Sequence, residues 1–274
     1  MDNGQDYKTD RKNDPTDGPN FVEFAKVLRT TLDAYGQSVS KPMSISLAAP
    51  ARLVDLVPYN VTATTKGLDA QIDFWNLMVS ALLELDGERR NRRIHLLTLQ
   101  SYDYMNRRET HSKHHTSADI VADTLAIYTG YGIAKEKLLI VFAMYAKWFQ
   151  TSAVPSECPA PHINCDLATV YEDPVTGEDE GISGRVTFNT AVTDNPAMVA
   201  KWHAIGEYQH HDEQASARTA LIDSTFWTWP SEEDTLEACK RSIDNAGGAF
   251  IWAVNQDSAG APHIRQLQAC LGIV

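Results

Sequence analysis

The chain has 274 residues, of which 43% are hydrophobic and 22% are charged, and its formal net charge is −12. This is enough apolar material for the core of one large domain or two small ones. The acidic charge argues against nucleic acid or an anionic membrane surface as a partner, because binding phosphate groups requires a basic face. No apolar run approaches the length of a membrane span, and the residues after Met1 predict no signal peptide.

The N-terminal part of the chain changes character near Asn20. Residues 1–19 contain hardly an apolar side chain, which predicts a disordered tail. Apolar residues then recur at helical spacing, so we expect an amphipathic helix that Asn20 caps and Gly36 ends. The short apolar stretch 43–49 predicts the first strand.

Strands and helices alternate through the rest of the chain. The expected strands are 72–78, the nearly all-apolar 138–145 and 249–254, and the expected helices are 118–131, 231–245 and 263–271. Ser231 and Asp234 form an expected capping pair at the start of one helix. Segment 150–228 is rich in turn residues and predicts an insertion with its own β structure.

This alternation is typical of a parallel α/β fold. A complete (β/α)₈ barrel needs eight strand–helix units in about 250 residues, whereas roughly four strands are recognisable in this chain. The predicted fold class is therefore an incomplete (β/α)₈ TIM barrel, with an α+β-type insertion before its last strand.

Two short segments, IDFWNLM at 72–78 and SYDYM at 101–105, join into one string. That string resembles the sixth barrel strand of the glycoside hydrolases of family 18, the chitinase family, and its M-x-Y-D motif. Residues 20–50 resemble the fourth helix and fifth strand of the fungal members, and 247–257 the eighth strand. The resemblance implies that 20–274 is a catalytic domain holding about strands five to eight.

The family motif D-x-x-D-x-D-x-E, which ends the fourth strand and supplies the catalytic glutamic acid, occurs nowhere in the sequence. The chain is expected to begin just beyond it.

Residues 79–100 interrupt the sixth strand with a highly charged segment. A surface helix inserted into a loop would account for such a segment. We favour a retained intron, because the interruption falls inside a strand and because codons for Val79 and Gln100 can supply the GU and AG ends of an intron. Sequencing the spliced transcript distinguishes the two explanations.

In this family the N-acetyl carbonyl of the substrate attacks the anomeric carbon, while one glutamic acid protonates the leaving oxygen. By resemblance, Tyr102 and Asp103 are the catalytic residues present: Tyr102 would bind the acetamido oxygen, and Asp103 would contact the sugar from the same strand end. Trp252 would stack beneath the pyranose ring, and Met78 would line the pocket. If the family resemblance is set aside, Tyr102 and Trp252 are expected to be core residues at strand ends, and Asp103 is expected to be a turn residue.

Chitin or chito-oligosaccharides are the partner that the resemblance implies, with no cofactor. Two histidine groups, His111–His115 and His210–His211, lack the spacing of metal-binding motifs, so no metal is expected. Cys158 and Cys165 bracket a proline-rich loop that suits a local disulfide, with free thiols as the alternative. Free thiols are expected for Cys239 and Cys270.

The sequence leaves two classes of function open. The first is a chitinase-like enzyme that hydrolyses β-1,4-linked N-acetylglucosamine polymers, extracellular by resemblance and inactive as written because the catalytic glutamic acid is absent. The second is a non-catalytic carbohydrate-binding relative or a non-functional fragment. An unrelated α/β hydrolase or phosphate-binding protein is disfavoured, because the sequence contains neither G-x-S-x-G nor a Walker loop.

Overall fold

The computed structural model describes residues 16–50, 61–78, 103–107, 109–152, 157–167, 171, 173 and 178–273. Most of the expected N-terminal tail, the whole interrupting segment 79–100 and Tyr102 lie outside these residues.

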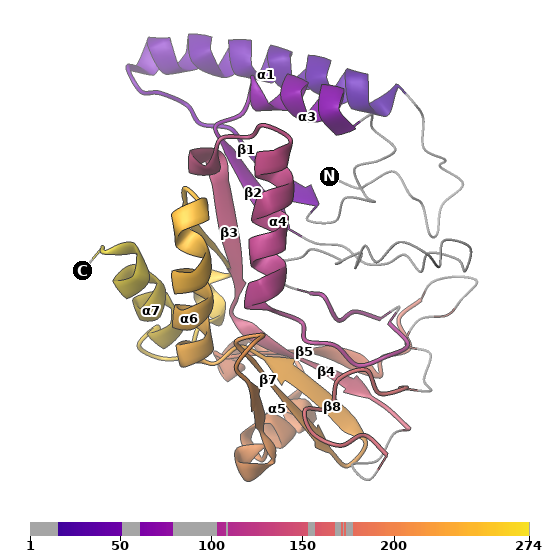
Figure 1. Ribbon diagram of the computed structural model, residues 1–274. Helices are drawn as coiled ribbons and strands as arrows, with labels where there is room; N and C mark the ends of the chain where they lie inside the picture. The colour runs from indigo at the N-terminus through magenta and orange to yellow at the C-terminus, as the bar shows by residue number, and fades with distance from the viewer. Residues whose placement is uncertain are drawn as a thin grey trace.

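Four parallel strands form the first sheet (Figure 1). In spatial order they are β1 (Ser46–Pro50), β2 (Phe74–Met78), β3 (Leu138–Ala143) and β9 (Gly248–Trp252). Each strand pairs with its neighbours in the order in which the strands occur in the chain. This is the arrangement of one sector of a β/α barrel, and within the described residues the sheet does not close, because β1 and β9 do not pair.

Five helices pack on or near the outer face of this sheet. They are α1 (Asp17–Val39), α3 (Val61–Asp69), α4 (Ala118–Gly130), α6 (Glu232–Ser242) and α7 (Pro262–Leu271). Alternate strand residues such as Leu138, Ile140 and Phe142 share one buried cluster with these helices, whereas Val141 and Ala143 point to the other face. None of the described helices is long and apolar enough to cross a membrane.

The second sheet is antiparallel and has the order β5-β4-β8-β7-β6. Its strands are β4 (Tyr145–Gln150), β5 (Ser183–Thr187), β6 (His210–Asp212), β7 (Ala217–Ile222) and β8 (Thr225–Trp229), and α5 (Pro196–His203) packs against it. Short 3-10 helices occupy Lys135–Lys137, Thr190–Val192, Gly206–Tyr208, Ile243–Asn245 and Val254–Gln256. Only Met144 separates β3 from β4, so the chain passes directly from the parallel sheet into the antiparallel one (Figure 1).

The first helix corrects two expected boundaries. It begins at Asp17, inside the expected tail, and it continues through Gly36 to Val39. Gly36 does not end the helix. It allows the following chain to pass close by, since a Cβ at this position would lie 2.5 Å from the Lys41 carbonyl oxygen.

The expected second half of the split strand is also corrected. Residues 103–105 are not in a strand, and the Tyr104 amide donates instead to the His115 carbonyl oxygen at 3.2 Å. Of the two halves, only 74–78 joins the described sheet, because the backbone after Asp103 pairs with the loop that precedes α4.

Both cysteine pairs form disulfides. Cys158–Cys165 is confirmed, with a Cα–Cα distance of 5.5 Å. The expectation of free thiols at Cys239 and Cys270 is wrong, because these residues are bonded to each other with a Cα–Cα distance of 6.3 Å. They are far apart in the sequence, and it is the packing of α6 beside α7 that brings them together.

Candidate functional site

The candidate site lies at the carboxyl ends of the parallel strands, on the face away from the helices. Ala143 of β3 is in register with Trp252, the last residue of β9. Ala249 and Ile251 pack toward the helices, so the alternation of side chains along a strand places Phe250 and Trp252 on the opposite face. The Trp252 side chain is 41% exposed there. In β/α barrels this end of the sheet is where active sites are built.

Asp103 lies at the centre of a cluster of polar side chains next to this edge. The Tyr145 hydroxyl donates to Asp103 Oδ1 at 2.7 Å, and Lys147 Nζ is 3.1 Å from the same oxygen. Tyr145 and Lys147 are two residues apart in β4, so their side chains leave the strand on the same side. Arg185, which pairs with Lys147 across β4 and β5, lies over the Tyr145 ring at 5.7 Å from its centroid. Tyr145 also packs with Phe250 and therefore links this cluster to β9.

The cluster keeps Asp103 ionised. Burial by itself raises the pKa of Asp103, but the Lys147 ammonium group, together with His115 and Tyr145, holds this pKa well below its ordinary value. Asp103 is therefore a carboxylate at any pH at which the protein is expected to work. It can accept hydrogen bonds from a ligand, and it has no proton to donate as a general acid.

The backbone at Asp103 adopts a left-handed conformation, with φ of 62°. Aspartate tolerates this region better than most residues, although it still costs free energy relative to an ordinary conformation.

His115 is buried and packs against this cluster. Its side chain is fully buried, and its ring packs against Tyr145 with 5.3 Å between the centroids. His115 Nδ1 is 3.8 Å from Asp103 Oδ1, which is beyond hydrogen-bonding distance. Burial lowers the pKa of His115, and the nearby Asp103 opposes this effect only in part. The imidazole is therefore neutral near pH 7, and Lys147 is the cation next to Asp103.

The structure brings together some of the predicted site residues. Asp103 and Trp252 both lie at the carboxyl end of the parallel sheet, on segments that Tyr145 connects. Met78 ends β2 at the same edge, in register with Pro50. Tyr102 lies outside the described residues. The positions of Asp103 and Trp252 suit their predicted roles, which stay predictions.

Sequence reasoning missed Tyr145 and Lys147 as site residues. The sequence contains a pattern that could have indicated them. Tyr145 and Lys147 follow the apolar run of β3 and are separated by one residue, so polar side chains appear where the chain leaves a buried strand. His115 was noticed, but only as part of a histidine group.

The histidine groups do not converge on one point. His114 Nε2 pairs with Asp212 Oδ2 at 3.0 Å, and His211 Nε2 pairs with Asp234 Oδ1 at 2.8 Å. No group of three or more residues with metal-binding side chains is found in the part of the chain that the structure describes.

Comparison with solved structures identifies the fold. The chain is similar to a multi-modular chitinase from Paenibacillus sp. str. FPU-7, with 18% identity, 94% of this chain and 26% of that chain covered, and a TM-score of 0.66. It is also similar to an N-acetylglucosaminidase from Paenibacillus barengoltzii, with 17% identity and a TM-score of 0.64. The match covers 94% of this chain and 65% of that chain. A third similar structure is a chitinase from Cycas revoluta in complex with allosamidin, with 15% identity and a TM-score of 0.67. The match covers 95% of this chain and 66% of that chain.

These likenesses establish a TIM-barrel-like α/β fold, and the chain spans less than two thirds of the length of the first two structures. No curated protein matches the sequence. The model of the glycosyl hydrolases family 18 matches residues 4–257, which is most of the chain. The chain therefore belongs to glycosyl hydrolase family 18.

Proposed function

We propose that this chain binds β-1,4-linked N-acetylglucosamine oligosaccharides at the carboxyl end of its parallel sheet and does not hydrolyse them. The observation that carries the proposal is that a fixed carboxylate, Asp103, and an exposed indole, Trp252, lie at the same edge of the sheet. Solved relatives support the choice of ligand, because a Cycas revoluta chitinase has been crystallised with (GlcNAc)3.

Asp103 supplies the polar half of the site. Its carboxylate is held in place by Tyr145 and Lys147, so it loses little conformational freedom when it accepts a hydrogen bond from a sugar hydroxyl or amide group. About a third of its side chain is exposed, at 32%, which leaves room for such a contact.

Trp252 supplies the apolar half. An exposed indole face stacks on the C–H groups of a pyranose ring, and this contact requires no proton donor. Stacking on Trp252 and hydrogen bonding to Asp103 together match the two chemical faces of a sugar. Both groups bind the ground state of the ligand, so they explain affinity rather than turnover.

Hydrolysis requires a proton donor near the leaving oxygen. Asp103 cannot be that donor, because its pKa is lowered. The D-x-x-D-x-D-x-E motif, which by family resemblance supplies the donor, is absent from the sequence. We therefore propose that this chain binds carbohydrate without hydrolysing it.

The test is a calorimetric titration of the full chain with the N-acetylglucosamine trisaccharide. Trp252→Ala is expected to weaken binding by about 1 to 3 kcal/mol, the range for losing one large aromatic contact. Val254→Ala is the matched control, because Val254 is an exposed neighbour, at 69%, that does not lie in the strand. Equal affinities of the Trp252 variant and the wild type would contradict the proposal, as would release of chromophore from a chitobioside substrate by the unmodified chain.

A further inference from the structure

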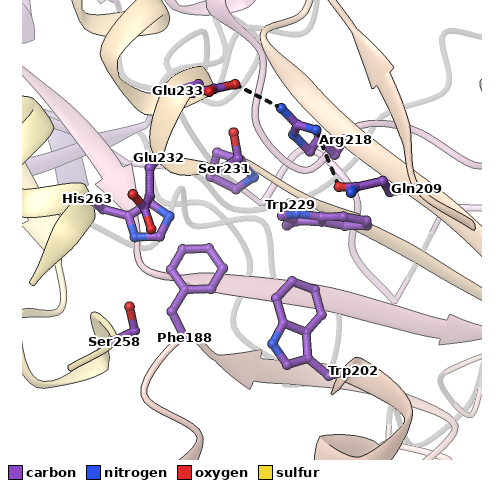
Figure 2. Close-up of a pocket in the computed structure, with 11 residues that line it drawn as sticks. Phe188, Trp202, Gln209, Arg218, Trp229, Ser231, Glu232, Glu233, Ser258 and His263 are labelled. Carbon is purple, nitrogen blue, oxygen red and sulfur yellow. Dashed lines mark hydrogen bonds and ion pairs between the residues drawn. The ribbon is translucent and has the colours of Figure 1, made fainter. Parts of the chain in front are cut away.

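A cavity lies between the antiparallel sheet and the first turns of α6 and α7. Its volume is about 430 Å³, within the range of small-ligand sites. It is lined by Phe188, Trp202, Trp229, Arg218, Glu232 and Ser258, among others (Figure 2). Neither Asp103 nor Trp252 contributes to the lining, so this cavity is separate from the candidate site at the end of the parallel sheet.

Aromatic rings from three different elements make up the apolar wall. Phe188 follows β5, Trp202 lies on α5, and Trp229 ends β8. Trp202 meets Trp229 edge to face, with 5.2 Å between the ring centroids, and Phe188 lies between Trp202 and His263. Figure 2 shows these rings around one hollow. The mutual packing fixes their positions before any ligand binds, which reduces the entropy cost of binding.

Two polar groups that line the cavity are unpaired. The Glu232 carboxylate and the Ser258 hydroxyl have no partner among the residues that the structure describes. Arg218, by contrast, is already engaged: it donates to Asp234 at 3.0 Å and to Gln209 at 3.3 Å. Among the described lining residues, the cavity therefore offers a carboxylate and a hydroxyl to a ligand, and its arginine is already paired.

This combination selects a class of ligand. An anionic ligand would be repelled by Glu232 and Glu233, and a wholly apolar one would leave the polar groups desolvated without a partner. A pyranose ring satisfies both sides, because its C–H face stacks on aromatic rings and its hydroxyl groups donate to carboxylates. We infer that this cavity is a second saccharide-binding site, with Trp202 as its stacking surface and Glu232 and Ser258 as its hydrogen-bonding groups.

The experiment follows the indole N–H signals of the full chain by ¹⁵N NMR during titration with the N-acetylglucosamine trisaccharide and, separately, with cellotriose. The Trp252→Ala variant is used, so that the site at the end of the parallel sheet is disabled. The Trp202 signal is expected to shift with a saturable dependence on at least one of the two sugars. Absence of any shift with both sugars would overturn the inference.

Two further variants locate the binding. Trp202→Ala is expected to weaken binding in the Trp252→Ala background by at least about 10-fold. Ser258→Phe fills the cavity without removing any aromatic contact and is expected to abolish the Trp202 shift. Tyr208→Ala is the matched control, since Tyr208 is 64% exposed and does not line the cavity.

A Trp202 shift that persists in Ser258→Phe would also overturn the inference. Loss of trisaccharide binding on Trp252→Ala alone, with the Trp202 signal unmoved by both sugars, would reject this second site and leave the proposed function intact. A Trp202 signal that shifts with sugar, together with unchanged trisaccharide affinity in Trp252→Ala, would reject the proposed function and leave the second site intact.

Discussion

Two carboxylates in this protein have opposite surroundings. Asp234 lies in the first turn of α6 and completes the capping box with the N-cap Ser231: it accepts a hydrogen bond from the Ser231 amide at 2.8 Å, pairs with Arg218 and His211, and has a side chain only 1% exposed. Asp103 is held by side chains alone among the described residues, on a backbone with positive φ, and is partly open at the end of the parallel sheet.

The difference indicates what each carboxylate does. A carboxylate that satisfies a helix N-terminus and joins two parts of the fold stabilises the protein, and it has no free oxygen face for a ligand. A carboxylate that is kept ionised by a lysine and a tyrosine, at the same end of the sheet as an exposed indole, can contact a ligand. We therefore assign stability to Asp234 and binding to Asp103, and each variant below tests that division.

The largest expected effect is on stability at Asp234. Asp234→Ala removes one half of the capping box of α6 and leaves Arg218 and His211 without their shared partner, so the free energy of unfolding should fall by about 3 kcal/mol. Chemical denaturation measures this change.

Glu233→Ala is the matched control for Asp234→Ala. Glu233 contacts the same guanidinium group at 3.5 Å, but its side chain is 87% exposed. Its loss should change the free energy of unfolding by less than about 0.5 kcal/mol. Equal losses of stability in Asp234→Ala and Glu233→Ala would contradict the structural role that we assign to Asp234.

A smaller effect is expected from pH. Burial lowers the pKa of both His114 and His115 in the folded protein, so the unfolded chain binds more protons than the folded one below about pH 6.5. Stability contributed by the neutral imidazoles is present above that pH and is lost as the pH falls. Denaturation curves should show a decrease of about 1 to 2 kcal/mol between pH 7 and pH 5.

His115→Gln should make this pH dependence shallower, whereas His111→Gln, at an exposed position, should leave it unchanged. His115 is thus assigned a part of the pH dependence, and His114 the rest. A pH profile that is identical in all three proteins would show that His115 is not held neutral by burial.

The sequence predicted the parts of the fold that depend on local pattern. The apolar runs gave β3 and β9 to within a few residues, and the Ser231–Asp234 capping box was predicted because both members lie within one helical turn. The order of the strands in the parallel sheet also follows from the alternation of strands and helices.

Features that depend on long-range packing were missed. The Cys239–Cys270 disulfide requires α6 and α7 to lie side by side, and nothing in either helix alone indicates this. Lys147 is similar: its position next to Asp103 depends on how the chain leaves β3 and enters the antiparallel sheet. Gly36 looked like the end of a helix, although its role is to accommodate the chain that passes close to it.

The most direct test compares Asp103→Asn with Asp234→Asn by calorimetric titration with the N-acetylglucosamine trisaccharide, on protein shown to be folded by circular dichroism. Each substitution removes one negative charge at nearly constant volume, so the two variants differ only in location. We expect affinity to fall by about 10-fold in Asp103→Asn, the loss of one charge-assisted hydrogen bond, and to stay at the wild-type value in Asp234→Asn. Equal affinities in the two variants, or a loss confined to Asp234→Asn, would contradict the assignment of ligand binding to Asp103.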